Sequence, residues 1–302
     1  MKNLKHFLPY LFLRFVCVLL MLLPLRLVYL LAEFIGYLGF YVFRFRRDVV
    51  LENLAIAFGM ELHEGQRTAL AARSYKQIAM TFLELMIAPR LRKQIQQMWT
   101  LEQQELLLNL LSQGNGLVCV SGHLGNWEFQ GAAIANLLAE HFTVAAVQQS
   151  NPYINRFVTR RRNAMSMQVA GSKEAMKLLV RALRNHQAIG LVADQNAGLS
   201  AVFVDFFGKT AATMPGPAQL ALKYRAPLVV FVALRTGPAK FKVLAEQVPV
   251  QEDDTVESLT QRHVKVLESY IRKHPEQYFW LHRRWKTRPS WEEKIEKRES
   301  GS

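Results

Sequence analysis

Short apolar runs alternate with stretches of helical periodicity from Gly116 to Lys273, and this alternation most constrains the fold. The apolar runs occupy residues 117–121, 142–147, 188–193, 228–234 and 241–245, and the helical patterns occupy residues 127–139, 153–165, 173–185, 215–224 and 255–273. Strands that are apolar without interruption are typical of parallel sheets buried on both faces. We therefore predict an α/β fold, an αβα sandwich with a mainly parallel sheet.

Three further helical patterns, at residues 48–58, 64–88 and 101–111, precede the first strand and carry no evident chemistry. No internal repeat or low-complexity linker divides the chain, and 302 residues suffice for one large α/β domain with an appendage. We predict one domain at residues 44–290 and a charged C-terminal tail at residues 291–302.

The amino terminus is unusually apolar. From Phe7 to Leu25 the only charged residue is Arg14, and a second apolar stretch at residues 27–43 ends in a basic cluster, Arg44, Arg46 and Arg47. A signal peptide is disfavoured because no small-x-small cleavage pattern follows the apolar run. We predict a membrane anchor of one or two helices at residues 1–43. Spanning takes about 20 apolar residues, so the segment suits either a spanning or an in-plane helix.

Composition favours an anionic partner. Lys and Arg total 38 against 24 Asp and Glu, giving a net charge of +14, and half of the residues are hydrophobic. The apolar excess makes a membrane surface a better partner than nucleic acid. Cys17 and Cys119 both lie in apolar runs, so we interpret them as small hydrophobic residues of a reducing compartment rather than as a disulfide.

The candidate site lies in the sequence SGHLGNWEFQ at residues 121–130, between a predicted strand and a predicted helix. Ligands of open α/β sheets bind beyond the carboxyl ends of the strands. There, a carboxylate that accepts a hydrogen bond from one imidazole nitrogen leaves the other nitrogen as a base. His123 and Glu128 are therefore candidate catalytic residues, suited to deprotonating a hydroxyl that attacks an acyl carbon. The alternative is a structural histidine in a turn, with Glu128 at a helix start.

A second pair, His263 and Glu268, has the same spacing but lies within one predicted helix. Five residues rotate a helix by about 140°, so we expect that pair on different faces, at the solvated surface. A metal site at His123 is disfavoured because no other His or Cys grouping accompanies it and zinc needs at least three protein ligands. We expect no metal and no cofactor.

The segment GHLGNWE at residues 122–128 resembles the histidine-x4-acid motif of the lysophospholipid acyltransferase superfamily, in a form similar to the bacterial lipid A biosynthesis (lauroyl/myristoyl) acyltransferases. Further matches follow in the order of that family, at residues 47–58, 151–152, 194–195 and 202–213. The closing block PEQYFWLHRRWKTRP, at residues 275–289, closely resembles that of the family and is much more specific than the His–Glu pair.

The resemblance implies an enzyme of the bacterial inner membrane, with its catalytic domain on the cytoplasmic face. Such an enzyme moves a fatty acyl chain from an acyl carrier protein to a hydroxyl of a phosphorylated glycolipid, the lipid A precursor. It implies that His123 is the base and Glu128 its charge-relay partner. Arg162 is expected to steady the thioester oxyanion or to bind phosphate, although Arg160 and Arg161 adjoin it. Asp194 is expected either to orient the substrate or to cap a strand end.

The closing block combines cations with aromatic residues, a pattern that suits RNA as well as an anionic membrane interface. The apolar amino terminus favours lipid, since each cation near an anionic leaflet contributes about 1 kcal/mol. We therefore expect Arg283, Arg284 and Lys286 to bind headgroups. The alternative is a surface cluster that covers the last strand.

Direct acyl transfer without a covalent intermediate is the predicted mechanism, because no G-x-S-x-G nucleophile signature accompanies the His–Glu pair. Backbone amides at the helix start near Trp127, or Arg162, would stabilise the oxyanion. Two alternatives stay open. One is an acyltransferase of the same fold that acts on another glycolipid or a lysophospholipid, and the other is a non-enzymatic peripheral lipid-binding protein.

Overall fold

The computed structural model describes residues 2–289, apart from residues 139–141, 147–148, 166 and 172–173. Its centre is a seven-stranded sheet in the order β1-β9-β8-β2-β5-β3-β4. The strands are β1 (Trp99–Leu101), β2 (Leu117–Ser121), β3 (Phe142–Ala146), β4 (Gln168–Gly171), β5 (Ala188–Val192), β8 (Leu228–Gly237) and β9 (Lys240–Val248). Neighbouring strands are parallel except for the β8–β9 hairpin. The predicted α/β fold with a mainly parallel sheet is confirmed.

Both faces of the sheet are buried, which explains why its strands are apolar without alternation. In β2, Val118 and Val120 pack in the same apolar cluster as α9 (Ala175–Arg184), α10 (Gly216–Tyr224) and α11 (Val256–Lys273). Leu117 and Cys119 pack in a second cluster with α6 (Gln104–Ser112) and α7 (Trp127–Leu138). Each helix lies close to the bounds predicted from the apolar periodicity. Cys17 and Cys119 are both buried free thiols, as expected.

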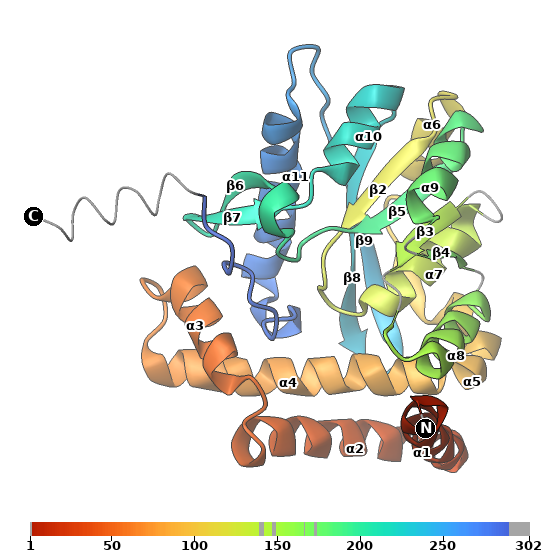
Figure 1. The fold of residues 1–302 in the computed structure, drawn as a ribbon, viewed down its shortest axis with the longest axis vertical. Coiled ribbons are helices and arrows are strands. Elements are labelled where there is room, and N and C mark those ends of the chain that lie inside the picture. Colours follow the sequence, from red (N-terminus) through yellow and green to blue (C-terminus); the bar gives the residue numbers. More distant parts are fainter. Residues whose placement is uncertain (1, 139–141, 147–148, 166, 172–173, 290–302) are drawn as a thin grey trace, which may run out of the picture.

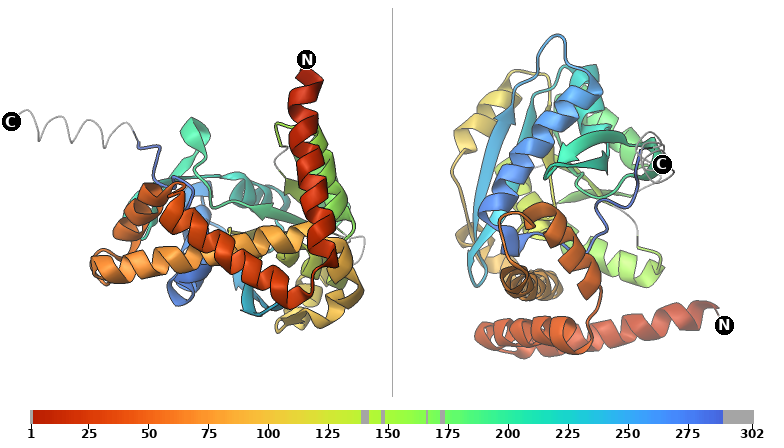
Figure 2. Two further views of the ribbon diagram at one scale, coloured as in Figure 1. Left: turned by 90° about the horizontal axis from the view of Figure 1, so that it is seen from below. Right: turned by 90° about the vertical axis from the view of Figure 1, so that its left-hand side faces the viewer.

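The helices that precede the sheet lie along one edge of the molecule (Figure 1). They are α1 (Lys2–Leu22), α2 (Leu25–Tyr37, continued by a π-helical turn at Leu38–Val42), α3 (Arg47–Phe58) and α4 (Glu64–Met86), which leads into the short α5 (Ala88–Leu91). Figure 2 shows α2 running along α4 and α1 turning away beside α8 (Pro152–Asn163). By length and composition, Lys5–Leu22 and Leu25–Val42 could each cross a membrane.

Two features of the fold were not predicted. Strands β1 and β4 have only three and four residues, too few for a clear apolar pattern. The second feature is an antiparallel hairpin, β6 (Val202–Phe206) and β7 (Lys209–Thr213), which stands apart from the main sheet. It packs on α11, where the backbone N–H of Asp205 donates to Gln261 Oε1 at 2.7 Å.

The charged tail predicted at residues 291–302 lies outside the described residues.

The same hairpin overturns the prediction for His263 and Glu268, which are buried rather than solvated. Glu268 accepts a hydrogen bond from the backbone N–H of Phe207 at 2.8 Å and one from Arg272 at 3.1 Å. Because α11 lies between the main sheet and the hairpin, both of its sides are covered. Spacing within a helix indicates which face a residue takes but not whether another element covers it.

Candidate active site

The turn that follows β2 is fixed by backbone contacts on two sides. Gly125 has φ +64°, and a Cβ atom there would collide with the carbonyl oxygen of Ala233 in β8. Its N–H donates to the carbonyl of Gln277 at 2.9 Å, and the N–H of Asn126 donates to the carbonyl of Ala233 at the same distance. A glycine is required here because the backbones approach so closely.

Asn126 then begins α7 as its N-cap. Its Oδ1 accepts hydrogen bonds from the backbone N–H groups of Glu128 at 3.0 Å and Phe129 at 2.9 Å. Such a cap contributes about 1 kcal/mol. The Asn126 side chain is fully buried, and its Nδ2 donates to Glu84 Oε2 in α4 at 2.6 Å. The first turn of α7 is therefore positioned before any substrate arrives.

Asp194 holds the imidazole of His123. Its Oδ1 lies 2.7 Å from His123 Nδ1, and its Oδ2 accepts the backbone N–H of His123, also at 2.7 Å. The two residues meet because β2 and β5 are adjacent parallel strands whose carboxyl ends are in register. A carboxylate at Nδ1 fixes the tautomer that carries the lone pair on Nε2. That nitrogen lies 3.4 Å from the side-chain nitrogen of Gln195.

Two aromatic rings enclose the imidazole. The ring of Trp127 lies 5.3 Å from that of His123, and the ring of Phe279 lies 5.8 Å from it, measured between centroids. The side chain of His123 is 21 % exposed, so one part of it still reaches solvent. The enclosure restricts water around the ring and strengthens its interaction with Asp194.

The charges of this pair stabilise each other. Burial lowers the pKa of His123, but the charge and hydrogen bond of Asp194, with the charge of Glu128, raise it above its ordinary value. Burial raises the pKa of Asp194, yet His123 and the charge of Arg284 hold it below its ordinary value. Asp194 is therefore an ionised acceptor beside a histidine that readily takes up a proton.

Glu128 does not hold the imidazole, which is where the structure departs from the sequence-based interpretation. Both of its carboxylate oxygens accept hydrogen bonds from Arg162 of α8, from Nε and Nη2, each at 2.8 Å. Burial lowers the pKa of Arg162, and the hydrogen bonds and charge of Glu128 raise it overall. Asp194, expected to orient substrate or cap a strand, occupies the place at Nδ1 that was expected for Glu128.

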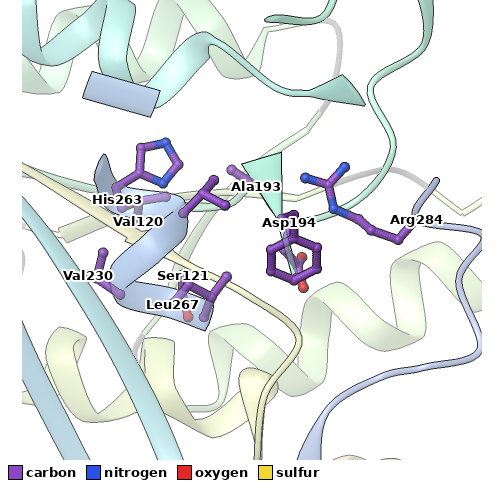
Figure 3. A pocket seen from close by; sticks show the side chains of 10 residues that line it. Val120, Ser121, Ala193, Asp194, Val230, His263, Leu267 and Arg284 are labelled. Carbon is purple, nitrogen blue, oxygen red and sulfur yellow. The ribbon is translucent and has the colours of Figure 1, made fainter. Parts of the chain in front are cut away.

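A small cavity is lined by Asp194 but not by His123, and Figure 3 shows His263 and Arg284 around it. Arg284 is 2 % exposed and donates to the carbonyl of Ala212 at 2.6 Å and to the Thr213 hydroxyl. Its expected role in headgroup binding is therefore wrong. Burial, with the charge of Arg284, lowers the pKa of His263 to about 3, so that ring is neutral.

The closing block is mainly scaffold for the site. The N–H of Phe279 donates to the carbonyl of His123 at 2.9 Å, and the loop after β5 is tied to the block where the N–H of Asn196 donates to His282 Nε2 at 2.9 Å. Asn53 of α3 donates to the carbonyls of Trp280 and His282, both at 2.7 Å. Of the three cations expected to bind headgroups, Arg283 and Lys286 are exposed.

A hollow of about 400 Å³ opens beside His123, between α7 and the strands β3, β4 and β5. Polar side chains line one part of it: His123, Glu128, Arg162 and Gln195. The rest is mainly apolar, with Phe142, Val144, Met167, Val169, Leu191 and Phe231. A base beside an apolar hollow suits a substrate that has a reactive polar end and a hydrocarbon tail.

Among the described residues, no group of three or more His, Cys, Asp or Glu side chains could hold a metal ion. The charge partners at the site are instead two guanidinium groups. Arg162 pairs with Glu128, and Arg284 acts on Asp194 from behind.

A family model described as bacterial lipid A biosynthesis acyltransferase matches residues 1–287. The chain belongs to this family. It is 29 % identical over 272 residues to the lipid A biosynthesis lauroyltransferase of Escherichia coli (strain K12), covering 88 % of each chain. It is 24 % identical over 279 residues to the lipid A biosynthesis palmitoleoyltransferase of the same organism, covering 88 % of this chain and 87 % of the relative.

A shorter similarity links the chain to the phosphatidylinositol mannoside acyltransferase of Mycolicibacterium smegmatis (strain ATCC 700084 / mc(2)155). The two are 30 % identical over 126 residues, which is 40 % of this chain and 41 % of that protein. All three relatives are named as acyltransferases, and their names refer to glycolipids. Membership of the family makes this chain an acyl-transferring enzyme.

Several residues that build the site escaped sequence reasoning. Behind Asn126, the carboxylate of Glu84 is shared with Arg235 of β8 and the hydroxyl of Tyr29 in α2. Glu84 lies 55 residues from Tyr29 and 151 from Arg235, so no local pattern connects them. The sequence did offer a hint that Gln195 belongs to the site, since Gln195 adjoins Asp194 in a block that resembles one of the family.

Proposed function

We propose that this protein moves a fatty acyl chain from an acyl carrier protein thioester to a hydroxyl of a phosphorylated glycolipid, a lipid A precursor. The observation that carries the proposal is the fixed imidazole of His123, which borders a hollow of about 400 Å³ with a largely apolar wall. Family membership agrees with acyl transfer to a glycolipid. Acyl carrier protein as the donor and a lipid A precursor as the acceptor are what we propose beyond family membership.

The acid–base step follows from the tautomer. Asp194 holds the proton of His123 on Nδ1, so Nε2 takes the proton of the acceptor hydroxyl as its oxygen attacks the thioester carbonyl. The tetrahedral intermediate then collapses, the carbon–sulfur bond breaks, and the departing thiol takes the proton back from Nε2. One carbon–oxygen bond forms and one carbon–sulfur bond breaks, and the proton of the hydroxyl ends on the thiol. No covalent acyl-enzyme is needed.

Arg162 is our candidate for stabilising the oxyanion, together with the backbone N–H groups at the start of α7. The bidentate pair with Glu128 holds the guanidinium at the rim of the hollow. Glu128 in this proposal positions Arg162 rather than the imidazole. It also raises the pKa of His123 by its charge, so it contributes to the base as well.

The amino terminus is proposed to hold the active site at the membrane. In residues 1–43, the anchor of our proposal, α1 and α2 present exposed apolar side chains: Phe12 is 70 % exposed, Leu22 77 % and Phe34 56 %. The catalytic domain, residues 44–290, would then stand on the cytoplasmic face of the bacterial inner membrane, where the net charge of +14 favours anionic lipid and an acidic carrier protein.

A second candidate is a transferase of the same fold that acts on a different glycolipid. The similarity to the phosphatidylinositol mannoside acyltransferase supports it, although that similarity covers 40 % of this chain. The two candidates share donor chemistry and differ in the acceptor.

Mass spectrometry with the full-length protein tests both. Acyl carrier protein loaded with a fatty acyl thioester is incubated with a tetra-acylated lipid A precursor or with a phosphatidylinositol mannoside. We expect the lipid A precursor to gain the mass of one acyl chain, and His123→Ala to abolish the gain. Transfer only to the mannoside would select the second candidate, and equal transfer by His123→Ala would refute the mechanism.

A further inference from the structure

We propose a phosphate-binding site in the hollow of about 300 Å³ between α1 and α8, lined by Arg14, Arg160 and Arg161. Its ligand is a phosphate monoester carried by the glycolipid acceptor, so the inference rests on the proposed function. The site is separate from the hollow beside His123.

Three guanidinium groups meet in this hollow without an acid. The other lining residues are Cys17, Val18, Met21, Pro89 and Phe157, and none is acidic. Across the part of the chain that the structure describes, none of the three arginines forms an ion pair. Burial and the charge of Arg14 lower the pKa of Arg161, so these two cations disfavour each other until an anion enters. Several guanidinium groups around one anion are typical of phosphate recognition.

The position of Arg14 gives independent support. It is the only charged residue between Phe7 and Leu25, in a helix whose other side chains there are largely apolar. The two arginines of α8 lie in its last turn, where the helix dipole alone favours cations. That account does not extend to Arg14, which belongs to another helix. A bound phosphate explains why a cation of α1 converges on the same hollow.

The wall of the hollow is held in place by contacts between the two helices. Tyr153 of α8 stacks on Tyr10 of α1 at 5.7 Å between ring centroids and meets Phe7 at 5.5 Å. Arg14 Nη1 donates to the Tyr10 hydroxyl at 3.3 Å. Arg161 lies 4.7 Å from the ring centroid of Phe157. Figure 2 shows α1 beside α8 along this contact. Two of the three cations are thus oriented before the ligand binds.

The same helix connects this hollow to the catalytic one. Arg162 pairs with Glu128 beside His123, whereas its neighbours Arg160 and Arg161 face α1. The two hollows therefore border different faces of α8, and no residue lines both. A phosphorylated disaccharide that carries hydroxyacyl chains has its phosphate and its hydroxyl on different parts of one molecule. Binding the phosphate at Arg160 and Arg161 would hold the hydroxyl near Nε2, beside Arg162.

The test measures binding, independently of turnover. Full-length His123→Ala protein is titrated with neutral phosphatidylcholine vesicles that contain either the phosphorylated lipid A precursor or its dephosphorylated form. We expect tighter binding to the phosphorylated form, and a triple change of Arg14, Arg160 and Arg161 to Gln to weaken that binding at least about tenfold, to the level of the dephosphorylated form. Arg156→Gln removes an exposed cation of the same helix outside the hollow, and its binding should equal that of the parent.

The site would be overturned by unchanged binding of the triple variant or by equal weakening in Arg156→Gln. Equal binding to phosphatidylglycerol vesicles would also overturn it, because it would indicate attraction to any anionic surface. A triple variant that loses only acyl carrier protein binding would also overturn it and assign the cluster to protein docking. Inorganic phosphate should compete only weakly if the site needs the lipid. If the triple variant is misfolded, Arg160→Gln alone should weaken binding in the same sense. Failed acyl transfer by a wild-type protein that still binds the phosphorylated lipid would refute the proposed function and leave the site intact.

Discussion

Replacing Asp194 with asparagine should remove most of the activity while keeping the size of the side chain. The carboxylate accepts two hydrogen bonds of 2.7 Å, from the backbone N–H of His123 and from its ring Nδ1. An asparagine can accept only one of them, and its NH₂ group then faces the other donor. The imidazole is driven towards the tautomer with its proton on Nε2. In that tautomer Nε2 has no free lone pair and cannot act as a base.

The expected loss of kcat is about 10²–10⁴-fold, the usual contribution of a positioned base. The corresponding change in serine proteases lies at the upper end of that range, about 10⁴-fold. The loss should exceed any effect on KM because Asp194 is buried behind the imidazole. The measurement is the initial rate of acyl transfer from the carrier protein thioester, at saturating glycolipid.

The pH profile separates this role from a merely structural one. A base works only when deprotonated, so activity falls as the pH drops through the pKa of His123. Burial lowers that pKa and Asp194 raises it. Without the carboxylate the pKa falls, and the acidic limb of kcat/KM should move to lower pH while the plateau drops.

Stability gives the control. The pKa of Asp194 is depressed in the folded protein, so its contribution to stability is present above the unfolded pKa of about 3.9 and is lost as the pH falls through the folded value. At neutral pH the variant should lose about 1–3 kcal/mol through the unsatisfied donor, measured by thermal unfolding. As a matched control, the same substitution at the exposed Asp253, Asp253→Asn, should change neither the activity nor the free energy of unfolding. Activity within threefold of wild type, with an unmoved acidic limb, would refute the assignment.

Three other changes test neighbouring parts of the site. Glu128→Gln and Arg162→Gln should each lower kcat about 10²-fold, and the double variant should lose little more than either, because the pair works as a unit. Additive losses in this double-mutant cycle would show that the two residues act independently. Gly131→Val should shorten the acyl chain that is transferred, since a Cβ at Gly131 would lie 2.7 Å from Met167 Sδ in the apolar wall of the hollow. Mass spectra of products from a series of acyl donors measure the preferred chain length, and an unchanged length would contradict this. Asn126→Ala should lower the free energy of unfolding by about 1–2 kcal/mol through loss of the α7 cap, and a melting temperature equal to wild type would contradict this.

The main sheet and the position of His123 could be predicted from the sequence because both follow from local pattern. Strand bounds at β2 and β5 are given by continuous apolar runs, and the position of His123 is given by the turn directly after β2. The partner of that histidine is not a local property. Asp194 reaches it through the pairing of β2 with β5, 71 residues away in sequence, while Glu128 is five residues away. Proximity in sequence therefore favoured the wrong carboxylate for Nδ1.

The closing block shows a second limit of sequence reasoning. Its cations and aromatic residues have the composition of a lipid-binding surface, yet Trp280 is 1 % exposed and Arg284 is 2 % exposed. Composition does not report burial, and a buried arginine that donates to one carbonyl and one hydroxyl is rare enough that exposure was the natural expectation. Only the fold shows that this segment lines the back of the site.

Charge balance connects α8 and the closing block to the site of this protein. Asp194 and Glu128 are two carboxylates that are at most 8 % exposed, and such groups are costly unless each has a cation. Arg162 of α8 serves Glu128, and Arg284 of the closing block acts on Asp194. His123 is the larger of the two charges that lower the pKa of Asp194, and Arg284 also lowers it, so the carboxylate keeps a cation nearby when the imidazole is neutral. In the mechanism that we propose, the imidazole starts the reaction neutral, takes the proton of the attacking hydroxyl, and returns it to the leaving thiol.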